Sequence, residues 1–147
     1  VPLNHNEALK WYRKAGDQGL GIALYKIAMM YEDGLGVQKD NNEAAKWHFK
    51  AAEYGFKRSY GRLGEMYKTG TGVQQDFQEA YMWYSLFNTN GFTSRMMGID
   101  DGKSSLVEIS QKLTEEQKAT AIQKGKDWLK GVSIKVKKRK PIYYSFS

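Results

Sequence analysis

The stretch GLGVQKD at residues 34–40 returns almost unchanged as GTGVQQD at residues 70–76. In both copies two glycines, one residue apart, precede a valine, and an aspartate closes the stretch. Glycine suits the left-handed backbone at the end of a helix, and aspartate suits the start of the next helix, where its carboxylate accepts backbone hydrogen bonds. The repeated stretch therefore predicts a helix-to-helix turn that occurs twice.

Closely spaced glycines before a helix also occur in phosphate-binding loops. Such a loop follows a strand and adds a Lys-Ser/Thr pair or a third spaced glycine before the helix. Here the preceding segment has a helical pattern, and the residues after the valine are Gln-Lys-Asp and Gln-Gln-Asp. The turn interpretation is favoured over a phosphate site.

The similarity extends far beyond the turn, because residues 8–43 and 44–79 are identical at 14 of 36 aligned positions. Each copy holds two segments with apolar residues at i, i+3, i+4 and i+7, the spacing of an amphipathic helix. In the first copy these are Ala8, Trp11, Tyr12 and Ala15, then Ala23, Leu24, Ile27, Ala28 and Tyr31. On the same grid Val1 lies one period before Val37, so we expect the chain to continue a longer protein or to have lost its first helix.

The composition fits one folded domain of 147 residues, with 41% hydrophobic residues and no cysteine. The net charge is +7, but five basic residues and no acidic one fall in residues 132–147. A basic tail on a nearly neutral body is weak support for nucleic-acid binding, which calls for a basic face on the fold itself. No nucleic-acid partner is therefore expected.

The residues that could carry chemistry do not form a site. His5 and His48 are the only histidines, and neither has a second ligand at metal-site spacing. Packing or a partner contact is the favoured role for His48. Adjacent acids at 32–33 and 100–101 lie at turns and do not face a common reacting centre. The sequence predicts no enzyme, no metal, no cofactor and no small-molecule substrate.

The pattern A-x-K-W-x-x-K-A, then glycine, then L-G-E-M-Y-x-x-G-x-G-V-x-x-D, resembles the Sel-1-like repeat, a relative of the tetratricopeptide repeat. The resemblance is clearest over 44–76, nearly as clear over 1–40 and partial over 77–91. It implies an all-α fold, an α-solenoid of antiparallel helix pairs, in a bacterial adaptor protein. We therefore expect repeats over 1–91, the first truncated at its N-terminus, a divergent helical cap over 92–131, and a basic aromatic tail over 132–147.

The cap is expected to end in a helix that starts after Thr114. Thr114 and Gln117 have the spacing of a capping box, and the segment resembles the LTPEQ helix that closes bacterial members of the family. No helical period is apparent beyond Gly131. A short strand, a docked strap or a floppy basic end are the alternatives for the tail.

In a tetratricopeptide-like stack the first helix of each pair lines the concave side. The side of these helices opposite the apolar stripe is therefore the predicted partner-binding site. Its residues are Lys10, Arg13, Lys14, Lys46, Phe49, Lys50, Met82 and Ser85. Phe49 and Met82 are expected either to lie exposed, where they would grip a helix or extended segment, or to be buried by neighbours or by the tail.

The resemblance implies a non-enzymatic module that binds a protein or peptide, in its narrower form an inhibitor (immunity-type) or escort of a secreted effector. The alternative is a protein of the envelope or membrane surface that uses its tail. The tail contacts would then be Lys137, Lys138, Arg139, Tyr143 and Tyr144. A solvated tail is favoured over this alternative, and an exported or periplasmic location is favoured over the cytoplasm.

Overall fold

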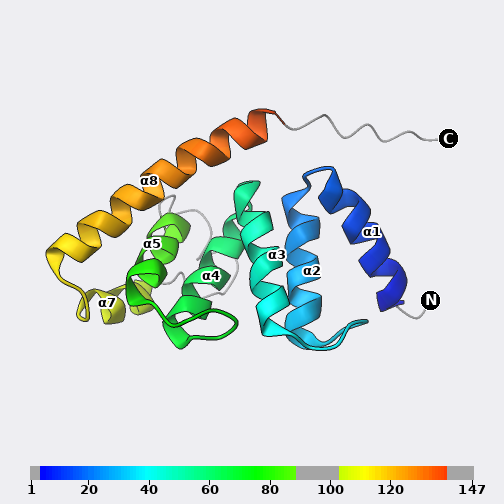
Figure 1. The fold of residues 1–147 in the computed structure, drawn as a ribbon, viewed down its shortest axis with the longest axis horizontal. Coiled ribbons are helices and arrows are strands. Elements are labelled where there is room, and N and C mark those ends of the chain that lie inside the picture. The colour runs from blue at the N-terminus through cyan, green and yellow to red at the C-terminus, as the bar shows by residue number, and fades with distance from the viewer. Residues whose placement is uncertain (1–3, 89–102, 139–147) are drawn as a thin grey trace.

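The computed structural model of the chain describes residues 4–88 and 103–138. In these ranges every regular element is a helix (Figure 1). The helices are α1 (His5–Asp17), α2 (Gly21–Asp33), α3 (Asn41–Glu53), α4 (Lys57–Thr69), α5 (Phe77–Asn88), α7 (Lys103–Ser110) and α8 (Glu115–Lys137). The expected all-α solenoid is confirmed: α1–α2 form the first repeat, α3–α4 the second, and α5 begins the third.

The repeated glycine stretch forms the turn that the sequence predicts. Gly34 and Gly70 end α2 and α4 in the left-handed region, with φ of 68° and 73°. Asp40 and Asp76 then start the following helices, and the Asp40 carboxylate accepts from the N–H groups of Asn42 and Glu43 at 2.9 and 3.1 Å. Because these hydrogen bonds satisfy donors that have no partner inside the helix, the aspartate fixes where the next helix begins.

Small residues bring neighbouring repeats into close contact. A Cβ atom added at Gly64 of α4 would lie 2.9 Å from Cγ of Tyr84 on α5, so no larger residue fits there without a shift. Ala28, the equivalent residue in α2, is fully buried. The aromatic residues Tyr60, Trp83 and Trp128 pack beside this contact and join α4, α5 and α8 in one core.

The three equivalent tryptophans differ strongly in exposure. Trp83 is 2% exposed and Trp47 is half-buried, but Trp11 is 69% exposed. The prediction of a buried stripe that includes Trp11 is therefore wrong for this residue. Trp83 is covered by Phe49 and Tyr60 of the preceding repeat and by Trp128, whereas no preceding pair lies against α1 in the described part of the chain.

The last helix is longer than the sequence pattern indicates. Thr114 and Gln117 form the predicted capping box, but α8 continues to Lys137. The expectation of no helix beyond Gly131 is therefore wrong for residues 132–137, and the helix crosses the boundary that was predicted there. The other predicted boundary, between residues 91 and 92, lies outside the described residues.

Tertiary contacts explain this helical extension. A Cβ atom at Gly55 would lie 3.6 Å from Val132 and 3.8 Å from Val136, and Lys135 pairs with Glu53 at the end of α3. These three residues of α8 recur at i, i+3 and i+4, so one face of the helix docks although valine is a modest helix former.

Among the described residues, no helix is both long and apolar enough to cross a membrane.

Candidate functional site

The repeat aligns two rows of residues across the first helices α1, α3 and α5. Residues 10, 46 and 82 form one row, and residues 14, 50 and 86 form the other; together they define the surface that we call the first-helix face. In the first two repeats the rows hold four exposed lysines, and in the third they hold two buried apolar residues. The six residues are Lys10, Lys46 and Met82, then Lys14, Lys50 and Leu86.

Helix α8 covers the third repeat of this face. A Cβ atom at Gly125 of α8 would lie 3.3 Å from Cγ of Met82 and 3.2 Å from Cδ2 of Leu86, so the backbone of α8 packs directly on these two side chains of α5. Met82 is only 3% exposed. The expectation of an exposed Met82 is therefore wrong, and the alternative of burial by a neighbour holds, with α8 as that neighbour.

Polar contacts in both halves of α8 hold it against α5 and α3. In the N-terminal half of α8, Lys124 pairs with Glu79, and the side chain of Gln78 donates to the carbonyl of Gln117 at 3.1 Å. Near its end, Lys135 pairs with Glu53, and this hydrogen bond raises the pKa of Lys135. Figure 1 shows α8 running from α7 past α5 towards α3, so the helix packs along α5 and reaches the C-terminal end of α3.

A third row, Arg13, Phe49 and Ser85, is less open than the sequence suggests. Phe49 is half-buried, with its ring centroid 5.8 Å from that of Trp83 and 6.2 Å from that of Tyr67. Arg13 donates to the hydroxyl of Tyr31, the residue equivalent to Tyr67, at 3.4 Å. Ser85 is also half-buried. Phe49 therefore bridges two repeats and does not stand free as an anchor for a partner.

The exposed lysines of the first-helix face form few ion pairs. Lys46 pairs with Glu43 at 3.1 Å. The Nζ atoms of Lys14 and Lys50 lie 5.4 and 4.3 Å from the ring centroids of Trp11 and Trp47. Within residues 4–88 and 103–138, no carboxylate pairs with Lys10, Lys14 or Lys50.

The predicted tail residues are only partly described. Lys137 ends α8 and Lys138 follows it, and both side chains are exposed. Arg139, Tyr143 and Tyr144 lie outside the described residues. Of the five predicted tail contacts, the structure therefore describes only Lys137 and Lys138.

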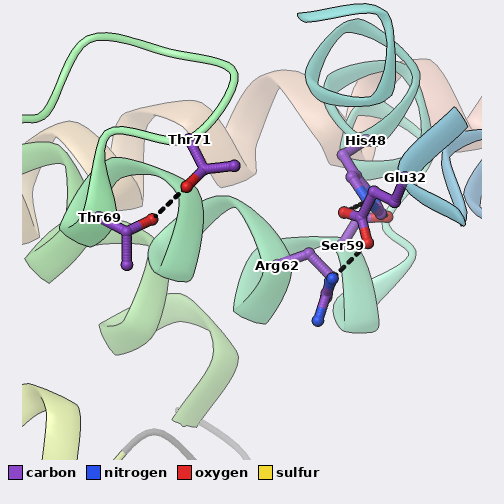
Figure 2. Close-up of polar contacts among 6 residues, drawn as sticks. All are labelled: Glu32, His48, Ser59, Arg62, Thr69 and Thr71. Atoms are coloured by element: carbon purple, nitrogen blue, oxygen red, sulfur yellow. Dashed lines mark hydrogen bonds and ion pairs between the residues drawn. The ribbon is translucent and has the colours of Figure 1, made fainter. Parts of the chain in front are cut away.

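A second group of polar residues lies between α2, α3 and α4. The Nε2 atom of His48 lies 2.9 Å from Oε1 of Glu32, its Nδ1 atom lies 3.4 Å from Oγ of Ser59, and Arg62 donates to the other Glu32 oxygen (Figure 2). These four residues form what we call the Glu32 network. The sequence predicted packing or a partner contact for His48; its full burial agrees with packing, but the hydrogen bonds to Glu32 and Ser59 were not foreseen.

The composition of the Glu32 network is that of a serine–histidine–glutamate triad, but its geometry does not fit a hydrolase. A nucleophile has to reach its substrate, and both Ser59 and His48 are fully buried. The network instead joins the first repeat to the second through hydrogen bonds. Among the described residues, no group of three or more histidine or acidic side chains could hold a metal ion.

The network also shifts the acidity of Glu32. Burial by itself would raise the pKa of this carboxyl, but the hydrogen bonds from His48 and Arg62, with the charge of Arg62, outweigh burial and lower the pKa below its ordinary value of 4.5. The folded protein thus binds this proton less readily than the unfolded chain. The contribution of Glu32 to stability is therefore complete above about pH 4.5 and is lost as the pH falls through the lowered pKa.

The lowered pKa of Glu32 predicts that the difference in the free energy of unfolding between the wild type and Glu32→Gln depends on pH. At pH 7 the wild type should have the higher free energy of unfolding, and the gap should narrow as the pH falls below about 4.5 and through the lowered pKa of Glu32. Urea unfolding at several pH values measures the gap. Since the other carboxyls titrate in both proteins, they cancel in the difference, and a gap that stays constant with pH would contradict the prediction.

A pocket of about 360 Å³ opens beside the Glu32 network. Its walls carry acidic, basic and hydroxyl groups without one dominant charge, and the hydrogen-bonded hydroxyls of Thr69 and Thr71 lie across it from Arg62 (Figure 2). The lining residues are Glu32, Asp33, Lys39, Asn41, Arg62, Glu65, Met66, Thr69 and Thr71. This mixture does not define the chemistry of a ligand, so the first-helix face is the better candidate site.

Two solved structures resemble the chain. One is c5321, a protective antigen of uropathogenic Escherichia coli strains with an SLR fold, with a TM-score of 0.74 and 28% sequence identity over 97% of this chain. The other is a Sel1 repeat protein from Oxalobacter formigenes, with a TM-score of 0.56 and 30% identity over 88% of this chain. The chain spans 30% of the first protein and 64% of the second. Among curated protein sequences, none matches the chain.

The family model of the Sel1 repeat matches residues 1–20, 21–56 and 58–91. These three matches together cover more than half of the chain and include α1 to α5. Sel1 repeats are generally protein–protein interaction modules, and the proteins that carry them are typically non-enzymatic scaffolds. The matched segments and the shared fold show that the chain belongs to the Sel1 repeat family.

Proposed function

We propose that the chain binds a protein or peptide partner on the first-helix face of its first two repeats. The observation that carries this proposal is the position of α8. In the third repeat the same face already receives a helix, which packs through Gly125 onto Met82 and Leu86. The equivalent positions in the first two repeats are exposed and carry no segment of the described chain.

The residues proposed to contact the partner are those that point outwards from α1 and α3. Lys10, Lys14, Lys46 and Lys50 form the surface, and Arg13 lies at its edge. Phe49 would support this surface from beneath, because its ring is held by Tyr67 and Trp83. Inhibition or escort of a secreted effector remains the narrower form of the proposal, since a segment held along this face would be shielded from other partners.

Site-specific photo-cross-linking tests where the partner lies. A photoreactive amino acid is placed at residue 14 or residue 50 of the full chain, and at residue 26 as a control. Lys26 is also exposed, but it lies on α2, outside the first-helix face. Adducts in the cell that makes the protein are expected from positions 14 and 50. Equal yields from all three positions, or adducts from residue 26 alone, would overturn the proposal.

A further inference from the structure

We infer that the partner segment is acidic, with carboxylates spaced to meet the lysine rows of the first-helix face; this inference rests on the proposed function. The evidence is the change of chemistry along equivalent positions of the repeat. Where the chain supplies its own helix, the face is apolar at Met82 and Leu86. Where the face is open, the same positions are Lys46 and Lys50 in one repeat and Lys10 and Lys14 in the other.

The apolar and the lysine positions of the first-helix face favour two kinds of contact, one permanent and one transient. Met82 and Leu86 suit a permanent neighbour, because burying them removes apolar area from water. Lysine on an open face keeps the surface soluble and attracts carboxylates, which favours a partner that binds and leaves. The lysines are spaced at i and i+4 on each helix, so their ammonium groups lie about one helical turn apart.

The ion pairs of the face support an anionic partner, because they leave three of its four lysines unpaired with a carboxylate in the described ranges. Glu53, at the rim of the face, is already paired with Lys135 of α8, and Glu43 is already paired with Lys46. Lys10, Lys14 and Lys50 have no carboxylate partner in the described ranges. Trp11 and Trp47 flank the lysines and would add aromatic contact area beside the charged pairs.

Helix α8 indicates the form in which such a segment would bind. It shows that a helix can lie against the first helices at close range when a small residue faces them. An acidic helix with glutamates at i and i+4 on one side, and small or apolar residues between them, would place its carboxylates over Lys10 and Lys14 or over Lys46 and Lys50. The partner class is therefore an acidic amphipathic helix of another protein.

The test uses three synthetic helical peptides and the isotope-labelled full chain. The peptides share an alanine–leucine background and differ only in residues at i and i+4, which are glutamate, glutamine or lysine. We expect the glutamate peptide to shift the amide signals of α1 and α3, and the indole signals of Trp11 and Trp47, more than the glutamine peptide does. Raising the salt from about 0.05 M to about 0.5 M should weaken this binding, because exposed charges are screened.

The matched variants locate the charges responsible. Lys14→Glu with Lys50→Glu should lower the affinity for the glutamate peptide roughly tenfold, since two attractive pairs become repulsive. Lys26→Glu with Lys39→Glu makes the same change in net charge at exposed residues outside the face and should leave the affinity unchanged. Unchanged amide spectra away from the substitutions establish that both variants are folded.

The contrary outcomes separate this inference from the proposed function. If the glutamine peptide binds α1 and α3 as well as the glutamate peptide, the face is a binding site and the acidic partner is wrong. If none of the peptides shifts these helices, the inference is overturned, while the cross-linking result still decides the proposed function. If the protein associates with itself through this face and the Lys14→Glu/Lys50→Glu variant is monomeric, a second copy replaces the acidic helix as the occupant.

Discussion

Trp83→Ala should lower the free energy of unfolding by about 3–5 kcal/mol, the range for removing a large aromatic side chain from a core. Trp83 is 2% exposed, and its ring centroid lies 5.8 Å from that of Phe49, 5.8 Å from that of Tyr60 and 5.0 Å from that of Trp128. One side chain thus joins α3, α4, α5 and α8. Urea unfolding followed by circular dichroism measures the loss.

Trp11→Ala is the matched control, because it removes the same side chain from the same position of the repeat. Trp11 is 69% exposed, so its loss should change stability by no more than about 0.5 kcal/mol. Trp83→Phe should fall between the two variants, since it keeps an aromatic ring in the core. Equal destabilisation by Trp83→Ala and Trp11→Ala would contradict the packing described for α8 and α5.

Glu32→Ala should lower the free energy of unfolding by about 2–3 kcal/mol, because it leaves buried polar groups without an acceptor. His48 is fully buried and loses the carboxylate that lies 2.9 Å from its Nε2 atom. Arg62 loses the same partner, but its side chain is 43% exposed and water can compensate part of the loss. The effect is therefore assigned mainly to His48, and urea unfolding at pH 7 measures it.

Asp33→Ala provides the control for charge and position. Asp33 follows Glu32 in the last turn of α2, but it is exposed. Its removal should change stability by less than about 0.5 kcal/mol. A loss as large as that of Glu32→Ala would point to a general effect of charge at the end of α2 and not to the Glu32 network.

The sequence predicts the repeat and its turns because the evidence for them is local. Glycine at the end of one helix and aspartate at the start of the next act through backbone geometry and nearby hydrogen bonds, which neighbouring residues determine. The capping box at Thr114 is predictable for the same reason. The family's general role in protein interaction follows from the repeat, whereas the identity of the partner does not.

The sequence does not predict which surfaces α8 covers, because α8 lies outside the repeated pattern. Repeat spacing places Met82 with Lys46 on one face, but only the docked helix makes Met82 buried and leaves Lys46 exposed. Residues 132–137 alternate in polarity like a strand, and their helix depends on contacts with the end of α3. The burial of His48 likewise depends on partners from two other helices.

The docked α8 also makes the two ends of the first-helix face different, because it covers the face only at the third repeat. A row of equivalent repeats would offer the proposed partner segment several similar positions, one repeat apart, between which it could slide. Because α8 closes the third repeat, sliding towards that end would bring the segment against α8. The proposed partner segment would therefore have one fixed end point on the face, where it meets α8. Gly125 helps to define the position of this end point, because it allows α8 to lie close to Met82 and Leu86.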